Sequence, residues 1–194
     1  MKPAVLTGLP PLVSDRTRLL ILGSFPGAAS LAAQQYYGHP QNHFWKILQA
    51  IWPDGPIGTG EDSYPMRSEW LLSKRLGVWD VYAACERNGS LDSKIRNAVV
   101  NDFAAVRQLC PELRAIAHNG GESFKHSKYV MGAWSAAGPP QGAKAPSGGS
   151  EDTPVTSVGI QFHRLPSTSP ANASWSFERK LSAWREVFEK HELI

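Results

Sequence analysis

The sequence is poor in the features that mark disulfide-bonded, metal-rich or membrane proteins. It contains only two cysteines, Cys85 and Cys110, so one chain can form neither a disulfide framework nor a four-cysteine zinc or iron–sulfur site. No stretch approaches the roughly 20 apolar residues of a membrane span. Pro10 and Pro11 interrupt the first residues, where a signal sequence would carry an apolar core. We therefore expect a cytoplasmic protein that is neither exported nor inserted into a membrane.

Motifs for metal or nucleotide binding are also absent. The sequence has neither a GxxxxGK[ST] loop nor a GxGxxG turn, which argues against a hydrolase of small nucleotides. His39 and His43 have the spacing of two metal ligands on one helix, but Pro40 lies between them and disfavours a helix there. No glutamate follows the first histidine, as it does in zinc-protease helices. We expect no metal and no cofactor.

What is present indicates a globular protein of one domain. The 194 residues are 42% apolar and 19% charged, which is enough apolar sequence to bury a substantial core. The formal net charge is +3 and the isoelectric point is about 8.9. This balance permits contact with a polyanion such as nucleic acid without requiring it. We expect residues 1–194 to form a single domain and a monomer.

Apolar segments that fit buried strands alternate with helical segments along the chain. The expected strands cover residues 19–22, 78–82, 114–118 and 155–162. Helical periodicity or capping residues follow each of them. Such alternation predicts parallel strands with helices on both faces of the sheet. The expected fold class is therefore α/β, a three-layer α/β/α arrangement around a central four-stranded parallel sheet.

Capping residues and prolines set the ends of the expected helices. One helix should stop before Pro53, and a helix over residues 66–76 should end near Gly77 in the left-handed conformation. Asn101 resembles an N-cap, and Ser174 can cap the last helix.

Three segments are expected to be irregular. Prolines in residues 1–18 indicate an N-terminal arm without regular structure. Residues 83–97 lack a clear period and indicate a long loop with one helical turn at most. Residues 135–154 have the glycine, proline and serine content of a flexible surface insertion. Deleting that insertion should change stability little, since loop-closure entropy varies slowly with length.

The stretch from Leu19 to Trp45 predicts a ligand pocket. The buried strand breaks at a turn from Gly23 to Gly27, where two glycines let the backbone approach a ligand closely. Tyr36 and Tyr37 and a segment rich in histidine and amide side chains follow. This mixture suits stacking on a flat heterocycle and reading of its edge by hydrogen bonds.

The same stretch resembles the uracil-DNA glycosylase superfamily, and within it the hypoxanthine (deoxyinosine) DNA glycosylases. The resemblance rests on segments that follow one another in the family's order: residues 23–27, 30–31, 35–40, 42–45, 77–82, 117–120 and 165–172. It implies a uracil-DNA glycosylase-like fold and a monofunctional enzyme of base-excision repair, with no lyase step at a lysine. The implied reaction is hydrolysis of the N-glycosidic bond of deoxyinosine, and of other deaminated bases, in DNA. The implied partner is DNA with a flipped nucleotide, so we expect association with the nucleoid.

Asn42 is the expected catalytic residue. In the family that the chain resembles, the matching asparagine is catalytic. Its amide cannot deprotonate water at neutral pH, but its carbonyl can accept a hydrogen bond from the attacking water and so position it. The alternative is that Asn42 only stabilises a turn after Pro40. Mismatch-specific relatives have asparagine where this chain has Phe25, so their catalytic position does not transfer.

Seven residues are expected to bind the base: Gly23, Ser24, Phe25, Tyr36, Tyr37, Asp80 and Asn119. In an extended segment the two tyrosines cannot point the same way, so one should stack and the other should pack or hydrogen-bond. Asp80 falls where relatives read the base edge, although an ion pair or a helix cap would also explain it. Asn119 precedes a glycine, where a turn amide is the commoner explanation.

Ser167, Thr168 and Ser169 are the expected DNA contacts. Their hydroxyl groups suit phosphate oxygens, and the prolines on either side stiffen the loop. The alternative is a serine-rich cap for the final helix. Two other functions also stay open: a catalytically inactive DNA-binding module, and a uracil- or mismatch-specific DNA glycosylase.

Overall fold

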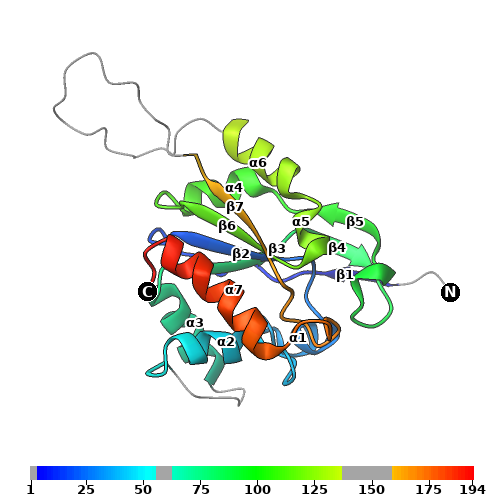
Figure 1. Cartoon of the computed structure of the whole chain (residues 1–194). Coiled ribbons are helices and arrows are strands. Elements are labelled where there is room, and N and C mark those ends of the chain that lie inside the picture. Colours follow the sequence, from blue (N-terminus) through cyan, green and yellow to red (C-terminus); the bar gives the residue numbers. More distant parts are fainter. Residues whose placement is uncertain (1–3, 56–62, 137–158) are drawn as a thin grey trace.

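The computed structural model describes residues 4–55, 63–136 and 159–194 of the chain. Its centre is a four-stranded sheet in the order β3-β2-β6-β7, formed by Leu76–Asp80, Leu19–Gly23, Ala115–Asn119 and Gln161–Leu165. All three neighbouring pairs are parallel. The predicted α/β fold with a four-stranded parallel sheet is therefore confirmed (Figure 1).

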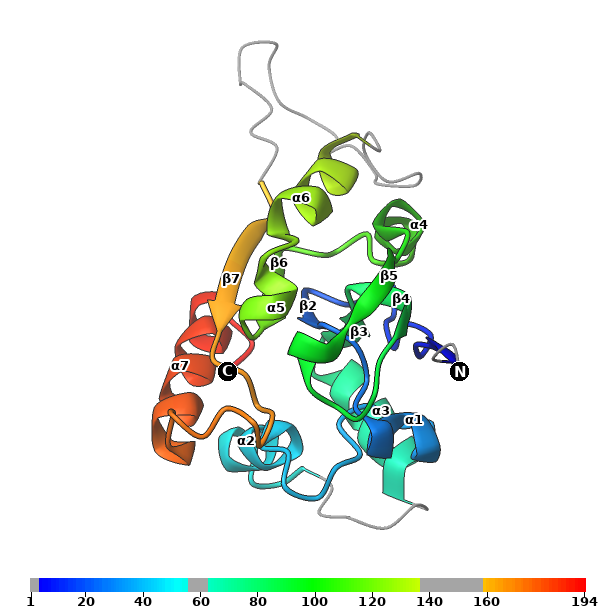
Figure 2. The same ribbon diagram turned by 90° about the vertical axis from the view of Figure 1, so that its right-hand side faces the viewer.

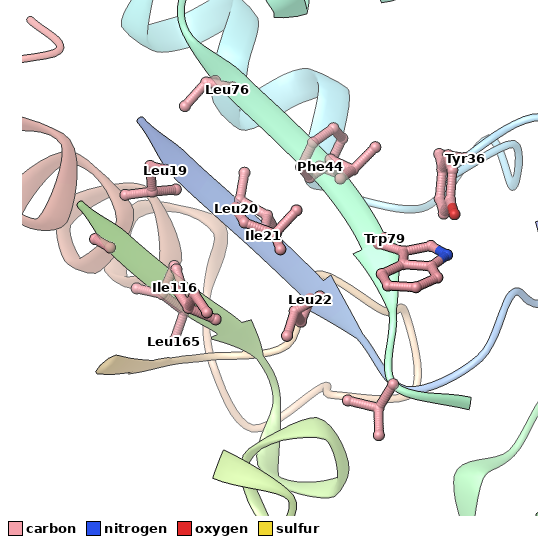
Figure 3. Packing of buried hydrophobic residues seen from close by; sticks show 14 of the residues in the cluster. Leu19, Leu20, Ile21, Leu22, Tyr36, Phe44, Leu76, Trp79, Ile116 and Leu165 are labelled. Carbon is pink, nitrogen blue, oxygen red and sulfur yellow. The ribbon is translucent and has the colours of Figure 1, made fainter. Parts of the chain in front are cut away.

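Strand β2 forms the middle of the core. Its residues Leu19 to Leu22 are fully buried, because β3 and β6 flank the strand and helices cover both faces of the sheet. Figure 3 shows these side chains between Leu76 and Trp79 on one side and Ile116 on the other. The continuous apolar run in the sequence thus corresponds to a strand without a solvent-exposed face.

Helices form the two outer layers (Figure 1). One layer contains α2 (Phe44–Ile51), α3 (Tyr64–Ser73) and α7 (Phe177–Lys190). The other contains α4 (Phe103–Leu109), α5 (Gly121–Phe124) and α6 (Ser127–Ala136). A short helix α1, Ala28–Ala33, follows β2 directly. The helix expected over residues 120–131 is thus two helices, α5 and α6.

A second, antiparallel sheet was not expected. It has the order β1-β4-β5 and consists of Val5–Thr7, Tyr82–Glu86 and Arg96–Val100. Two segments expected to be irregular, residues 1–18 and 83–97, are therefore partly strands. The one helical turn expected in the second segment is η2, Asp92–Lys94. The sequence does not indicate β4 and β5, because they pair through register shifts and four of the five β5 residues are exposed. The alternation of buried and exposed residues that identifies a strand is therefore absent.

Several expected element ends were wrong by a few residues. Arg75, not Gly77, has the left-handed conformation after α3, with φ 59°, and Gly77 lies inside β3. Asp102 caps α4 by accepting from the backbone amides of Ala104 and Ala105. Ser176, not Ser174, caps α7.

Asn101 does not cap α4 but donates from Nδ2 to the carbonyl oxygen of Asp80 at 2.9 Å. Its amide therefore supports the end of β3. Strand β7 begins later than expected, at Gln161. The insertion expected over residues 135–154 lies outside the described residues, apart from its first two residues, which end α6.

Candidate active site

A cavity of about 570 Å³ opens at the carboxyl edge of the parallel sheet. Within this sheet β2 comes first in the sequence, the next strand, β3, lies on one side of it, and β6 and β7 lie on the other side. The direction in which successive strands are placed therefore reverses at β2. Ligands of open α/β sheets bind outside the carboxyl ends of the strands at such a switch point. The ends of β2, β3 and β6 all contribute residues to this cavity.

Every site residue predicted from the sequence lines this cavity. The set is Gly23, Ser24, Phe25, Tyr36, Tyr37, Asn42, Asp80, Asn119, Ser167, Thr168 and Ser169. The residues come from four distant parts of the sequence, residues 23–42, 80, 119 and 167–169, which the sheet brings to one edge. Lining the cavity does not by itself give each side chain the predicted role, and several of them have other contacts.

Gly23 and Asp80 face each other at the ends of two paired strands. The register pairs Gly23 of β2 with Asp80 of β3, and a Cβ atom on Gly23 would lie 2.3 Å from the Asp80 Oδ1. Glycine is therefore required here because the carboxyl group occupies the space of a side chain. The other oxygen of Asp80, Oδ2, is buried and has no hydrogen-bond partner within the described residues.

The carboxyl group of Asp80 has an unusually weak acidity. Its pKa is raised to about 7, mainly by burial and also by the negative charge of Asp92, while Arg87 acts in the opposite direction. A buried carboxyl group without a partner is unfavourable in its ionised form. Titratable groups of this kind are enriched at functional sites.

The two tyrosines have different environments, although their segment is a turn, with Tyr37 at φ 55°, and not the extended chain considered from the sequence. Tyr36 is 4% exposed, and its hydroxyl donates to the carbonyl oxygens of Leu9 and Pro10 at 3.2 and 3.0 Å. Tyr37 is half-buried and stacks on Phe44, with ring centroids 3.9 Å apart. Tyr36 is therefore the packing and hydrogen-bonding member of the pair, and Tyr37 is the one near the cavity surface.

Asn42 is held by the backbone at the start of α2. Its Oδ1 accepts from the amide of Phe44 at 2.9 Å, which is the turn-stabilising contact of the alternative interpretation. A carbonyl oxygen has two lone pairs, so this contact leaves room for a second donor such as water. The amide of the next residue, His43, donates to the carbonyl oxygen of Thr168 at 2.9 Å. Asn42 is thus fixed relative to the loop after β7.

Asn119 connects two segments of the cavity wall. Its Nδ2 donates to the Tyr37 hydroxyl at 3.2 Å and to Thr168 Oγ1 at 2.9 Å, and its Oδ1 accepts from the Thr168 amide at 2.9 Å. Both of its donors are therefore used inside the protein. We call Tyr37, Asn42, Asn119 and Thr168 the buried wall of the cavity.

The prediction that Thr168 contacts DNA does not fit its position. The residue is 0% exposed, because its backbone and hydroxyl are both bonded to Asn119. Ser167 and Ser169 are half-buried, and their hydroxyl groups accept from backbone amides two residues further on. Only these two serines of the predicted three are accessible from the cavity opening.

Gly120 permits the close approach of this loop to the sheet. It has φ 106°, and a Cβ atom there would lie 3.0 Å from the Cβ of Ser167. Both the conformation and the space favour glycine. The loop after β7 is also held from α7, where Lys180 Nζ donates to the carbonyl oxygen of Asn172 at 2.9 Å.

One side of the cavity consists of residues that the sequence did not predict. Ser90, Leu91, Asp92 and Ser93, between β4 and β5, line it and are all exposed. We call these four residues the exposed rim. Figure 2 shows that their connection and the loop after β7 lie at the same end of the sheet. The signal that could have found the connection is Asn88-Gly89, a dipeptide typical of hairpin turns, where Gly89 has φ 75°.

The exposed rim is attached to the turn below it at two points. Ser90 Oγ accepts from the amide of Ala28, the first residue of α1, at 2.9 Å. Ser24 Oγ donates to Asp92 Oδ1 at 2.6 Å. The hydroxyl of Ser24, predicted to bind the base, is thus directed to Asp92.

Within the described residues, no group of three or more histidine, cysteine, aspartate or glutamate side chains could hold a metal ion. His163 and His191 form a pair, with their Nε2 atoms 2.7 Å apart, away from the cavity lining. Among the helices of the described residues, none has the length and apolar character needed to cross a bilayer.

Comparison with known proteins gives one consistent result. A family model described as the uracil DNA glycosylase superfamily matches residues 10–190. A curated relative from Methanosarcina barkeri, named hypoxanthine DNA glycosylase, is 32% identical over 187 residues, covering 94% of this chain and 98% of its own. A second, from Methanosarcina acetivorans and with the same name, is 32% identical over 183 residues, covering 93% and 96%.

A solved structure agrees with these relatives. The solution NMR structure of a Methanosarcina acetivorans protein, described provisionally as a uracil DNA glycosylase, is 31% identical to this chain and has a TM-score of 0.71. The match covers 97% of this chain and 99% of the other.

Proposed function

From the premise that this chain belongs to the uracil DNA glycosylase superfamily, we propose that it hydrolyses the N-glycosidic bond of deoxyinosine in DNA. The observation that carries the proposal is the convergence of Asn42, Asp80 and Tyr37 on one cavity at the carboxyl edge of the sheet. Asn42 supplies a carbonyl oxygen for the attacking water, Asp80 supplies a carboxyl group for the edge of the base, and Tyr37 supplies an aromatic surface.

The cavity suits a base that has left the DNA stack. A target atom inside a duplex is out of reach, so the nucleotide must be flipped into a pocket and held by stacking and edge contacts. Phe25 and Tyr37 offer aromatic surface, and Tyr37 is itself held in place by Phe44 and Asn119. The volume of about 570 Å³ lies within the usual range of small-molecule sites and leaves room for a purine.

Asp80 is the residue proposed to read the base edge. Deamination of adenine to hypoxanthine converts N1 from an acceptor to an N–H donor. When it is ionised, Asp80 can accept from that N–H through Oδ2, which is buried and has no partner within the described residues, and the same oxygen then faces an acceptor if adenine enters instead. The ionised carboxylate therefore binds the deaminated base and rejects an intact adenine.

Asn42 is proposed to position the attacking water. Cleavage of the C–N bond passes through an oxocarbenium-like sugar, so the water needs orientation more than deprotonation. Because Phe44 already fixes the Asn42 carbonyl, little ordering is required when the water binds. Ser167 and Ser169 are proposed to contact phosphate oxygens at the cavity opening.

An incision panel tests the proposal. Oligonucleotides carrying hypoxanthine, uracil or xanthine are incubated with the protein and treated with alkali, which opens abasic sites. We expect the fastest release for hypoxanthine, in keeping with the names of the two Methanosarcina relatives. Faster release of uracil under matched conditions would assign the chain to a uracil-directed enzyme. Binding without any abasic product would assign it to an inactive DNA-binding module.

A further inference from the structure

The lining of the cavity is acidic, although the proposed reaction places negative charge in it. Asp80 and Asp92 contribute carboxyl groups, whereas the described residues contribute no lysine or arginine to the lining and only one histidine, His39. When the C–N bond breaks, its electron pair leaves with the base, and the proton that the attacking water loses restores the neutral base afterwards. The two carboxyl groups oppose the charge on the departing base, and a cation nearby offsets them.

Arg87 is a buried cation directly behind this site. It follows strand β4, is 6% exposed and does not itself line the cavity. Its guanidinium group lies over the ring of Phe25, with 5.0 Å between Cζ and the ring centroid, and its Nη2 donates to the carbonyl oxygen of Pro26. Phe25 and Pro26 both belong to the lining. Arg87 therefore contacts the cavity wall from behind.

The positive charge of Arg87 has no direct ionic partner. The ion pairs of the described residues join Arg18 to Glu112 and Lys125 to Glu122, and neither involves Arg87. Its Nε and Nη1 are buried without a hydrogen-bond partner in the same part of the chain. A buried charge without a partner is unfavourable for folding, and groups of this kind are enriched at functional sites.

The field of Arg87 reaches into the cavity. Burial raises the pKa of both Asp80 and Asp92, and the charge of Arg87 opposes that rise in each of them. A flipped base that stacks on Phe25 lies one aromatic ring away from the guanidinium group. Charges interact strongly over such a distance in buried surroundings of low dielectric constant. Because Phe25 and Pro26 already hold Arg87, the charge is in place before the base arrives.

We propose that Arg87 stabilises the negative charge that develops on the departing base, acting across the Phe25 ring. This inference rests on the proposed glycosylase function, because it requires a base to be released in this cavity. Arg87 touches neither the base nor the bond that breaks, so it is a positioning residue that keeps a charge behind the stacking surface.

The test varies how well the base accepts negative charge. Single-turnover cleavage is compared for oligonucleotides that carry hypoxanthine or 8-azahypoxanthine. Replacing C8 by nitrogen leaves the N1–H and O6 edge unchanged but makes the base a better leaving group, so its departure needs less stabilisation from the protein. Rates are taken on the alkaline plateau of each variant's pH profile, so that Asp80 is ionised in every case.

Arg87→Gln removes the charge and keeps an amide that can donate to the Pro26 carbonyl oxygen. It should lower cleavage of hypoxanthine at least about tenfold, a smaller loss than that of a direct oxyanion donor, and cleavage of 8-azahypoxanthine less than about threefold. Arg87→Lys keeps the charge and should retain most of both rates. A ratio between the two Arg87→Gln losses below about threefold would overturn the proposal, because a displaced turn or ring slows both substrates equally.

Arg67→Gln is the matched control. Arg67 is 8% exposed, its buried Nε has no partner within the described residues, and it lies over the ring of Trp45 at 4.8 Å. Neither Arg67 nor Trp45 lines the cavity, so the ratio between the two substrates should not change. A loss in His39→Gln that depends on the leaving group, with none in Arg87→Gln, would assign the role to His39 and overturn the proposal.

A second measurement needs no substitution and so does not depend on the folding of a variant. Free 8-azahypoxanthine is anionic near neutral pH, whereas hypoxanthine is neutral. In the parent bound to DNA with an abasic-site analogue, the anion should bind at least about tenfold more tightly, since a site that stabilises the departing base favours its charged form. Equal or weaker binding of the anion would contradict the proposal. If the parent releases no base from any substrate, the proposed function fails. Equal losses of Arg87→Gln on both substrates, with an active parent, concern only this inference.

Discussion

The buried wall and the exposed rim bound the same cavity but are built in opposite ways. Thr168 of the buried wall is 0% exposed and shares three hydrogen bonds with Asn119 and, through its carbonyl oxygen, His43. The rim consists of exposed residues attached by the hydrogen bonds of Ser90 and Asp92. A dense network of buried hydrogen bonds fixes the positions of the side chains in the wall. A rim with few hydrogen bonds to the rest of the protein leaves its side chains free to contact a partner. We therefore expect substitutions in the wall to affect the proposed cleavage more than substitutions in the rim.

The largest effect should come from Asn42 of the buried wall. Asn42→Ala removes the proposed partner of the attacking water and should lower single-turnover cleavage about a hundredfold or more, the usual scale for one positioned polar group. Binding to product DNA should survive, since phosphate contacts supply much of the affinity. Asn42→Asp still orients water and should retain partial activity.

Gln41→Ala serves as the control for Asn42, because Gln41 is the exposed preceding residue and does not line the cavity. A rate for Asn42→Ala within about threefold of the parent would remove Asn42 from the catalytic role and make Asp80 the next residue to test.

The next effect concerns the pH dependence of stability at Asp80, which lies between the wall and the rim. Its ordinary pKa is 3.8, and burial raises it to about 7 in the folded protein. Between these values the folded state holds a proton that the unfolded chain has released, so a rise in pH destabilises the folded state. Asp80→Asn removes this titration. The difference in the free energy of unfolding between Asp80→Asn and the parent should therefore shift in favour of the variant by about 4 kcal/mol between about pH 4 and about pH 8.

Urea denaturation of both proteins at the two pH values measures this difference. Burial lowers the pKa of His118 to about 4, so this residue destabilises the folded state as pH falls. The effect is equal in both proteins and cancels in the difference between them. An advantage that stayed constant across the range would show that Asp80 ionises normally.

A smaller effect is expected when one hydrogen-bonding residue is removed from each side. Asn119→Ala leaves the buried Thr168 amide and the Tyr37 hydroxyl without their partner and should reduce the free energy of unfolding by about 2 kcal/mol. Ser90→Ala exposes the Ala28 amide to water and should cost less than about 0.5 kcal/mol. Equal losses in urea denaturation would mean that the two sides do not differ as described.

The smallest effect should follow removal of metal ions. Within the described residues, neither side of the cavity has a cluster of three or more side chains that could hold a metal ion, so excess chelator should change cleavage less than about twofold. Loss of activity that zinc restores would show that histidines outside the expected set, such as the His163 and His191 pair, bind a metal needed for the reaction.

The same comparison explains how much could be predicted from the sequence. The buried run Leu19 to Leu22 identified the central strand, because only a strand covered on both faces is apolar at every position. The residues of the buried wall were found because they lie in or next to segments that resemble a known family. For these regions, the local sequence is enough to predict the strand and the site residues.

The exposed rim could not be predicted in this way. The Ser24 to Asp92 hydrogen bond joins residues 68 positions apart, and nothing in the local sequence of either residue indicates the other. Strand β5 is exposed along most of its length, so it shows no alternation. The buried state of Thr168 likewise depends on Asn119, which is 49 positions away. Tertiary contacts of this kind decide which of several similar hydroxyl groups is available to a ligand.

The two cysteines, too few for a disulfide framework, can report local opening of the folded structure. Cys85 on β4 and Cys110 after α4 are both buried and free, and burial raises the pKa of both thiols. A thiol-reactive dye therefore labels them only when the surrounding structure opens. Because Cys85 lies on the antiparallel sheet that carries the rim, its labelling rate with and without DNA measures how far that sheet loosens during recognition, without any engineered probe.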